Sequence, residues 1–228
     1  MNAIPPAVLA LLLTWGTIVG LDLVSVPQGL LARPLVSAAV AGWLLGDFEA
    51  GLRVGALLEL FALDVLPVGA SRYPEYGPAA VGAVALAAGL PGMAGTGLGV
   101  LLGLAVAIPA GWTLDWLRHA NARHIHRLSA ALSDGAPGAI GQLQWAGLGR
   151  DVLRSAVVSA VAIALAVLVR TQLDPSSQLP TLQTPVLIGV GLAAALSGAV
   201  RTAGRGRRLA WVGIGLAAGL VVVLAVTA

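Results

Sequence analysis

Apolar stretches, separated by short polar or glycine- and proline-containing breaks, run along almost the whole chain. A helix that spans a bilayer needs about 20 mainly apolar residues. Five stretches come close to that length and predict full membrane spans: residues 7–24, 93–116, 151–169, 185–200 and 209–227.

The first half of the chain follows a different pattern from the second. Its remaining apolar segments, residues 34–45, 51–68 and 78–90, are short and are broken by Gly, Pro or charged residues. Short interrupted segments of this kind indicate discontinuous helices at a transport site. We therefore expect the functional region within residues 22–97. Tilted or kinked ordinary spans are the alternative interpretation.

Composition supports a membrane location. The chain has 228 residues, of which 58% are hydrophobic and 10% are charged, whereas a soluble domain carries about 25% charged residues. We predict an all-α integral membrane protein, a polytopic helical bundle with short broken or re-entrant helices in its N-terminal half. The absence of cysteine excludes disulfide and thiolate chemistry. The N-terminus lacks the basic region of a signal peptide, so we expect the first apolar segment to be retained.

The arginines predict the orientation of the chain. They gather in residues 117–150 and 201–208, whereas residues 171–183 contain none. By the positive-inside rule, the first two regions are expected in the cytoplasm and the third outside. One membrane domain, residues 1–228, would then comprise a motif-bearing half (about 1–116), a cytoplasmic interfacial segment (117–150) and three further spans (151–228). The three histidines of the interfacial segment lack carboxylates at ligand spacing, so contact with lipid headgroups or a soluble partner is favoured over metal binding.

Glu59 lies in an apolar run of the first half. A carboxylate at membrane depth costs about 2.5–3.5 kcal/mol on insertion scales, and such a residue is by default a candidate functional site. The alternatives are a snorkelling position near a helix end or a structural ion pair with Arg53 or Arg33. Arg53 precedes Glu59 by six residues, which excludes a local i,i+4 pair between them.

Other polar residues accompany Glu59 in the first hundred residues. Carboxylates and amides in apolar surroundings can bind sugar hydroxyls, and they can also bind protons or cations. No nucleophile motif, metal-binding helix or phosphate-binding loop is visible in the sequence, so neither an enzyme nor a cofactor is predicted.

Several motifs occur in an order that resembles a known family. Arg33-Pro-Leu, Gly46-Asp, Gly55-Ala-Leu-Leu-Glu59 and Gly69-Ala70 resemble the IIC subunit of the mannose/fructose/sorbose family of the bacterial phosphoenolpyruvate-dependent sugar phosphotransferase system. The motif-bearing match covers about residues 15–80. Pro67 departs from the family pattern, because family members commonly have a polar residue such as Asn before the Gly-Ala turn.

The resemblance implies a sugar-translocating subunit of the bacterial inner (plasma) membrane that carries out no chemistry itself. It implies a IID membrane partner, cytoplasmic IIA and IIB phosphocarriers that phosphorylate the sugar, and higher oligomers of IIC–IID pairs. A stand-alone ion-coupled transporter that uses Glu59 or Asp64, and a non-transporting membrane scaffold, are the alternative functions. Carried over by position, the substrate-binding residues would be Gln28, Glu59, Pro67, Gly69, Ala70 and Glu75, with Asp22, Arg33 and Asp64 as supporting polar residues.

Overall fold

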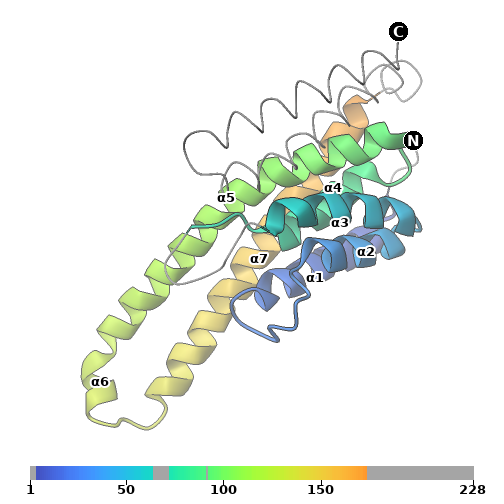
Figure 1. Ribbon diagram of the computed structural model, residues 1–228. Helices are drawn as coiled ribbons and strands as arrows, with labels where there is room; N and C mark the ends of the chain where they lie inside the picture. The colour runs from blue at the N-terminus through green and yellow to red at the C-terminus, as the bar shows by residue number, and fades with distance from the viewer. Residues whose placement is uncertain (1–3, 64–71, 91, 174–228) are drawn as a thin grey trace, which may run out of the picture.

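The computed structural model describes residues 4–63, 72–90 and 92–173 and consists there of helices and their connections (Figure 1). The predicted spans at 185–200 and 209–227 lie outside the described residues. The helices are α1 (Pro6–Asp22), α2 (Pro34–Leu44), α3 (Phe48–Ala62), α4 (Tyr76–Ala87), α5 (Gly92–Arg127), α6 (Ser129–Ser133) and α7 (Ala139–Gln172).

Two of the described helices are long and apolar enough to cross a membrane, namely α5 and α7, whereas α1, α2 and α4 are shorter apolar helices. At 1.5 Å per residue, the 11 residues of α2 extend about 16 Å, which is about half of a hydrocarbon core of ~30 Å. The short helices α2, α3 and α4 therefore lie in the segments in which the sequence predicts interrupted spans. The helix α1, with 17 residues, is shorter than the full span predicted at residues 7–24.

Local sequence sets where these short helices begin. Proline occupies the first turn of both α1 and α2, where its fixed φ suits the helix and no N–H is needed. The carboxylate of Asp47 caps α3 by accepting a hydrogen bond from the Ala50 amide at 3.0 Å. A Cβ added at Gly42 of α2 would lie 2.8 Å from the Cα of Gly51, so only glycine permits this close approach of α2 and α3.

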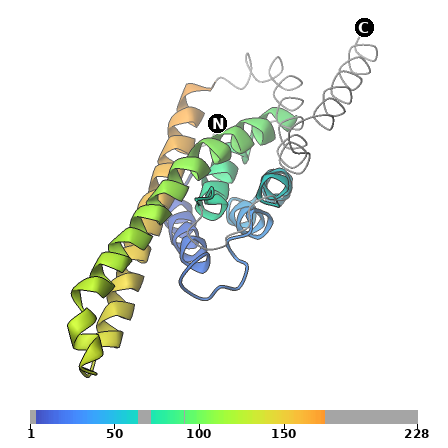
Figure 2. The ribbon, with the colours of Figure 1, turned by 60° about the vertical axis from the view of Figure 1, so that its left-hand side comes forward.

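The centre of the bundle is α4, in which residues 77–87 are all buried. It packs on α5 and α7, while α1 packs along α7 (Figures 1 and 2). A Cβ added at Gly16 of α1 would lie 2.6 Å from Oγ of Ser159 on α7. Small residues thus allow helices to approach closely, as is usual in membrane bundles.

The segment 117–150, which the sequence predicts as a cytoplasmic interfacial segment, is built largely from extensions of the two long helices. Residues 117–127 continue α5 without a break, and residues 139–150 form the first part of α7. The two long helices extend together beyond the rest of the bundle, and α6 lies at their junction (Figures 1 and 2). The reason is that the apolar stretch ends at Trp116, whereas the Ala, Leu, Arg and His residues that follow still favour a helix.

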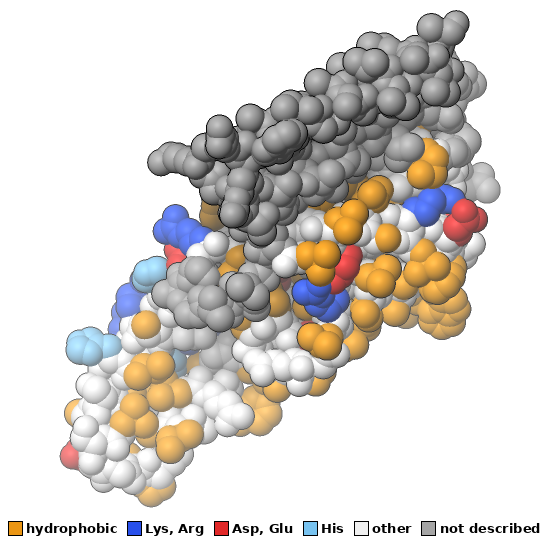
Figure 3. All heavy atoms as spheres, viewed as in Figure 1, with side chains coloured by type: hydrophobic (Ala, Val, Ile, Leu, Met, Phe, Trp, Pro, Cys, Tyr) orange, Lys and Arg blue, Asp and Glu red, His pale blue; other side chains and the backbone are white. Residues whose placement is uncertain are grey.

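The outer surface carries many large apolar side chains. Leu11 and Ile18 of α1, and Leu153, Val157 and Leu165 of α7, are among the exposed hydrophobic residues. Orange hydrophobic side chains are spread over the face shown in Figure 3. Helices that are apolar all round are typical of a bundle in contact with lipid.

Candidate functional site

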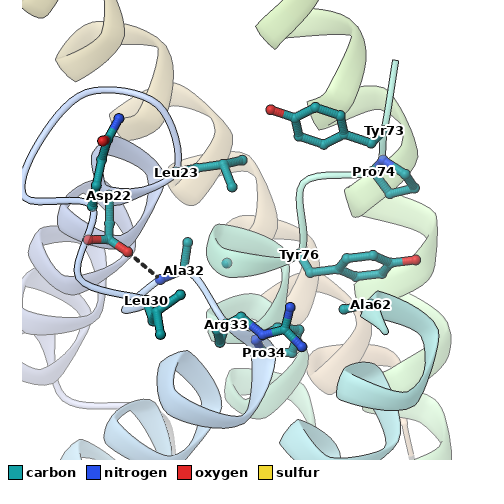
Figure 4. Close-up of a pocket in the computed structure, with 12 residues that line it drawn as sticks. Asp22, Leu23, Leu30, Ala32, Arg33, Pro34, Ala62, Tyr73, Pro74 and Tyr76 are labelled. Carbon is teal, nitrogen blue, oxygen red and sulfur yellow. Dashed lines mark hydrogen bonds between the residues drawn. The ribbon is translucent and has the colours of Figure 1, made fainter. Parts of the chain in front are cut away.

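A pocket of about 370 Å³ lies where α1 ends, α2 begins, α3 ends and α4 begins. In Figure 4, Leu23, Leu30 and Ala32 lie on one side, Tyr73, Pro74 and Tyr76 lie on the other, and Arg33 lies between them. The pocket is lined by Asp22, Leu23, Gln28, Leu30, Ala32, Arg33, Pro34, Ala62, Tyr73, Pro74, Tyr76 and Gly77.

The loop between α1 and α2 is held by the carboxylate of Asp22. This side chain is buried and accepts hydrogen bonds from the Gly29 amide at 2.6 Å and the Ala32 amide at 2.9 Å. Gln28 and Leu30 have φ values of 59° and 66°, a region that non-glycine residues seldom occupy. Such conformations persist only where the surroundings impose them, and the two bonds to Asp22 provide that constraint. Asp22 therefore shapes the wall that carries Gln28.

Arg33 is positioned by Glu59 from α3. The guanidinium donates through Nε to the Glu59 carboxylate at 2.6 Å and also pairs with it through its NH2 group. The other carboxylate oxygen accepts from the Leu35 amide at 3.1 Å, in the first turn of α2. Glu59 thus neutralises Arg33 and caps the positive end of α2. Glu59 is not itself among the residues that line the pocket, whereas Arg33 is. Glu59 therefore influences the pocket by holding the Arg33 side chain in place.

The opposite wall is fixed to α5 through Tyr73. Arg118 of α5 donates a hydrogen bond to the Tyr73 hydroxyl at 2.8 Å, and its guanidinium carbon lies 5.0 Å from the centroid of the Tyr73 ring. This combination of a hydrogen bond and a cation–π contact orients an aromatic side chain of the pocket.

Glu75 lies between the lining residues Pro74 and Tyr76 but takes part in a separate buried ion cluster, formed by Glu75, Asp151 and Arg154. The Arg154 guanidinium donates to both oxygens of Glu75, at 2.5 and 3.0 Å, and to Asp151 at 2.9 Å. Asp151 also accepts a hydrogen bond at 2.5 Å from the hydroxyl of Ser25, which lies in the α1–α2 loop. The three charged side chains are at most 3% exposed. The ion cluster ties the segment before α4 to α7.

The predicted site residues divide into four groups. Gln28, Asp22 and Arg33 line the pocket. Glu59 lies directly behind Arg33, so the structural pair with Arg33 is present, whereas Arg53 pairs with Glu49. Glu75 faces Arg154 and not the pocket. The predicted residues Asp64, Pro67, Gly69 and Ala70 lie outside the described residues.

Sequence reasoning missed Tyr73, Tyr76 and the partners of Glu75. Arg154, which contacts Glu75, is buried. The available signal was the spacing of Asp151 and Arg154, three residues apart at the start of a strongly apolar stretch. Opposite charges at that spacing share a helix face and at membrane depth indicate an ion pair.

The pocket combines groups suited to a small polar molecule. The Gln28 amide can donate and accept hydrogen bonds, the Arg33 guanidinium donates, and the two tyrosines offer both rings and hydroxyls. Its volume falls in the lower part of the roughly 300–1,000 Å³ range of small-molecule sites.

The short helices, the lipid-compatible surface and this pocket are those of an all-α integral membrane protein with a cavity among its short helices. The matching family is described as the PTS system sorbose-specific IIC component, and its family model covers residues 7–174. The chain belongs to this family, which confirms the membership indicated by the motifs around Arg33 and Glu59.

Two curated relatives are similar over part of the chain. The PTS system sorbose-specific EIIC component of Klebsiella pneumoniae is 35% identical over 78 residues, which is 34% of this chain and 27% of the relative. The component of the same description from Lacticaseibacillus casei is 33% identical over 73 residues, which is 32% of this chain and 26% of the relative. The matched segments span about a quarter of each relative's length.

Solved structures share the fold over the whole chain. A chain of the mannose transporter ManYZ, solved in complex with microcin E492, superposes with a TM-score of 0.63 at 19% identity and covers 100% of this chain and 97% of its own length. A second chain, described as a membrane protein, gives a TM-score of 0.68 at 20% identity, with coverages of 99% and 97%. The predicted fold class, an all-α membrane protein, is therefore confirmed.

Proposed function

We propose that this chain is the membrane-embedded, sugar-translocating IIC component of a mannose-family phosphotransferase system. The observation that carries the proposal is the pocket between the α1–α2 loop and the Tyr73–Gly77 segment, which presents an amide, a guanidinium and two tyrosines. The subunit works with a IID membrane partner and with IIA and IIB phosphocarriers. It binds and moves the sugar, and the IIB partner transfers the phosphoryl group.

The chemistry of the pocket supports a neutral polyhydroxyl substrate. The positive charge of Arg33 is offset by Glu59, so the pair adds hydrogen-bond donors without a strong net field. Tyr73 and Tyr76 can cover the apolar face of a sugar ring while Gln28 and Arg33 bind its hydroxyl groups. This mixture of apolar walls and a few polar groups is the usual composition of small-molecule sites.

The distribution of arginine supports a position in the bacterial plasma membrane in which the C-terminal end of α5 and the N-terminal end of α7 lie in the cytoplasm. Arg118, Arg123, Arg127 and Arg150 lie at that end of the bundle, whereas Arg53 and Arg170 lie near the other end. A surplus of arginine marks the cytoplasmic side. Because Arg118 contacts Tyr73, the pocket lies at the same end. The bound sugar would thus be close to the compartment that contains the phosphocarriers.

The hydrogen bonds of Glu59 make this residue a poor candidate for a cation or proton site. Its two carboxylate oxygens already accept from Arg33 and from the Leu35 amide. A bound cation would have to compete with a guanidinium that carries the same charge.

A reconstituted system tests the proposal. The chain and its IID partner are placed in proteoliposomes, and uptake is measured for a panel of hexoses with IIA, IIB, the general phosphotransferase proteins and phosphoenolpyruvate. Accumulation of sugar phosphate is expected. Gln28→Ala and Arg33→Gln should each weaken sugar binding about tenfold, the cost of losing a hydrogen bond to a charged or buried partner. The matched control, Gln144→Ala on the surface of α7, should bind sugar like the wild type.

Three outcomes would contradict the proposal. Uptake that needs no phosphocarrier and collapses with an uncoupler would show an ion-coupled transporter. Failure to accumulate any hexose with all partners present would indicate a scaffold. Phosphorylation-coupled uptake that survives both Gln28→Ala and Glu59→Ala would refute the assignment of the site.

A further inference from the structure

The C-terminal end of α5, the short helix α6 and the N-terminal end of α7 form a helical hairpin at residues 117–150. This hairpin extends past the membrane boundary. Trp112 and Trp116 are 62% and 56% exposed, and exposed tryptophans are typical of the interface. Residues 117–127 continue the helix for about 16 Å, and a tilt of about 40° still leaves about 12–13 Å. The headgroup layer is only about 5–8 Å thick on each side. The tip of the hairpin therefore lies in water.

The hairpin is strongly basic. It carries four arginines, residues 118, 123, 127 and 150, and one carboxylate, Asp134. Arg123, Arg127 and His126 are exposed. Figure 3 shows Arg and His side chains beside hydrophobic ones in this part of the surface, with an acidic side chain near the tip. A positive surface of this kind attracts an acidic partner and speeds its association.

The hairpin also exposes large apolar side chains where lipid tails cannot cover them. Ile140 and Trp145 are each 74% exposed, and Ile125 is 51% exposed. Tryptophan and arginine are the residues most enriched at the energetic centres of protein interfaces. Attraction to lipid headgroups needs only positive charge and would not account for apolar side chains beyond the headgroup layer.

Contacts between its two arms brace the hairpin. Arg150 of α7 donates to the Asn121 side chain at 2.9 Å and lies 2.9 Å from Nδ1 of His124, both on α5. At the base of the hairpin, Arg118 contacts Tyr73 of the pocket wall. A protein that docks on the hairpin would thus be held close to the wall of the pocket.

We propose that the hairpin is the docking surface for the soluble IIB-type phosphocarrier, which meets it through an acidic face with an apolar centre. The proposal rests on the proposed function, because the carrier must bring its phosphoryl group to the bound sugar. The negative charge of that phosphoryl group adds to the attraction exerted by Arg123 and Arg127. Trp145 supplies the apolar anchor.

Binding of the phosphorylated carrier to the reconstituted complex tests this docking surface. The chain and its IID partner are placed in nanodiscs of zwitterionic lipid, and the association and dissociation rates of the purified phosphorylated IIB-type carrier are measured at about 50 and about 300 mM salt. Arg123→Glu combined with Arg127→Glu should weaken binding at least about tenfold, mainly through slower association, and should remove most of the salt dependence.

Two single substitutions and a control separate the apolar from the electrostatic contribution. Trp145→Ala should weaken binding about tenfold through faster dissociation, as expected for loss of a buried anchor. Asp134→Asn removes the one carboxylate of the hairpin and should speed association. Gln144→Ala, which is adjacent to Trp145 and uncharged, should change neither rate.

Wild-type rates in both the charge-reversed variant and Trp145→Ala would overturn the docking proposal, as would absence of carrier binding to the wild type. Variants that lose binding to vesicles of anionic lipid while keeping carrier binding would show a lipid-binding hairpin instead. Sugar binding in the same nanodiscs without carrier reports on the pocket and on folding. If the wild-type complex phosphorylates sugar and the hairpin variants do so equally well, the docking proposal fails and the proposed function stands.

Discussion

Replacing Arg154 by Met would leave Glu75 and Asp151 buried without a counter-charge. The wild-type guanidinium makes two hydrogen bonds to Glu75 and contacts Asp151 at 2.9 Å, and it lies 3.1 Å from Oγ of Ser155. Removing one partner from a buried ion pair costs about 3–5 kcal/mol, which is a large part of a typical stability of about 5–15 kcal/mol. Met keeps the length and apolar stem of the side chain, so most of the loss comes from the charge.

The free energy of unfolding would be measured in mixed micelles by tryptophan fluorescence, with Arg53→Met as the matched control. Arg53 pairs with the exposed Glu49 at i,i+4, an arrangement worth about 0.3–0.5 kcal/mol, and donates to Oγ1 of Thr96 at 3.3 Å, a hydrogen bond worth about 1 kcal/mol. The loss in free energy of unfolding should therefore be about two to four times larger for Arg154→Met than for Arg53→Met. Adding Glu75→Gln to Arg154→Met should recover part of the loss, because it removes one of the unpaired charges.

A loss for Arg154→Met that equals the loss for Arg53→Met would refute this reasoning. It would mean that the ion cluster is hydrated or that its charges are compensated in another way. The same conclusion would follow if Glu75→Gln made the Arg154→Met variant less stable, since the unpaired carboxylate would then not be the source of the cost.

Three further substitutions, one of them with a second substitution that should rescue it, test the close packing and the two carboxylates around the pocket. Gly16→Ala should destabilise the protein by about 1–3 kcal/mol, the usual cost of overpacking, because its Cβ would lie 2.6 Å from Oγ of Ser159. Ser159→Gly in the same chain should recover part of that loss in the same unfolding assay. Asp22→Ala should weaken sugar binding, because the Gly29 and Ala32 amides lose their acceptor. Glu59→Gln should also weaken it, about three- to tenfold, because Arg33 loses a charged partner worth about 1 kcal/mol or more.

Each of these has an outcome that would contradict it. Full stability of Gly16→Ala would mean that α1 and α7 are farther apart than the structure shows. Wild-type sugar affinity in Asp22→Ala would show that the α1–α2 loop held by Asp22 does not contribute to sugar binding. If Glu59→Gln abolishes binding while Arg33→Gln leaves it unchanged, Glu59 contacts the sugar directly. Sugar affinities are measured in nanodiscs, with Gln144→Ala as the surface control.

The short helices of the first half were predictable because proline and glycine act locally. Pro34 starts α2 and the Gly46-Asp47 pair separates it from α3, as the sequence pattern predicts. The end of α5 was not predictable from hydropathy, which marks where a helix leaves the apolar layer and not where the helix stops. The same limitation applies to the start of α7.

The sequence by itself determined the membrane class, the family and the region of the pocket. These follow from composition and from motifs that are contiguous in the chain. The tertiary structure decided which charges meet. Arg33 and Glu59 are 26 residues apart, and Arg154 and Glu75 are 79 residues apart, so no local periodicity relates them. Only the packing of α2 on α3, and of α4 on α7, brings each carboxylate to its guanidinium. For that reason Glu59, which the sequence marks as costly, supports Arg33 at the pocket, while Glu75 supports the fold.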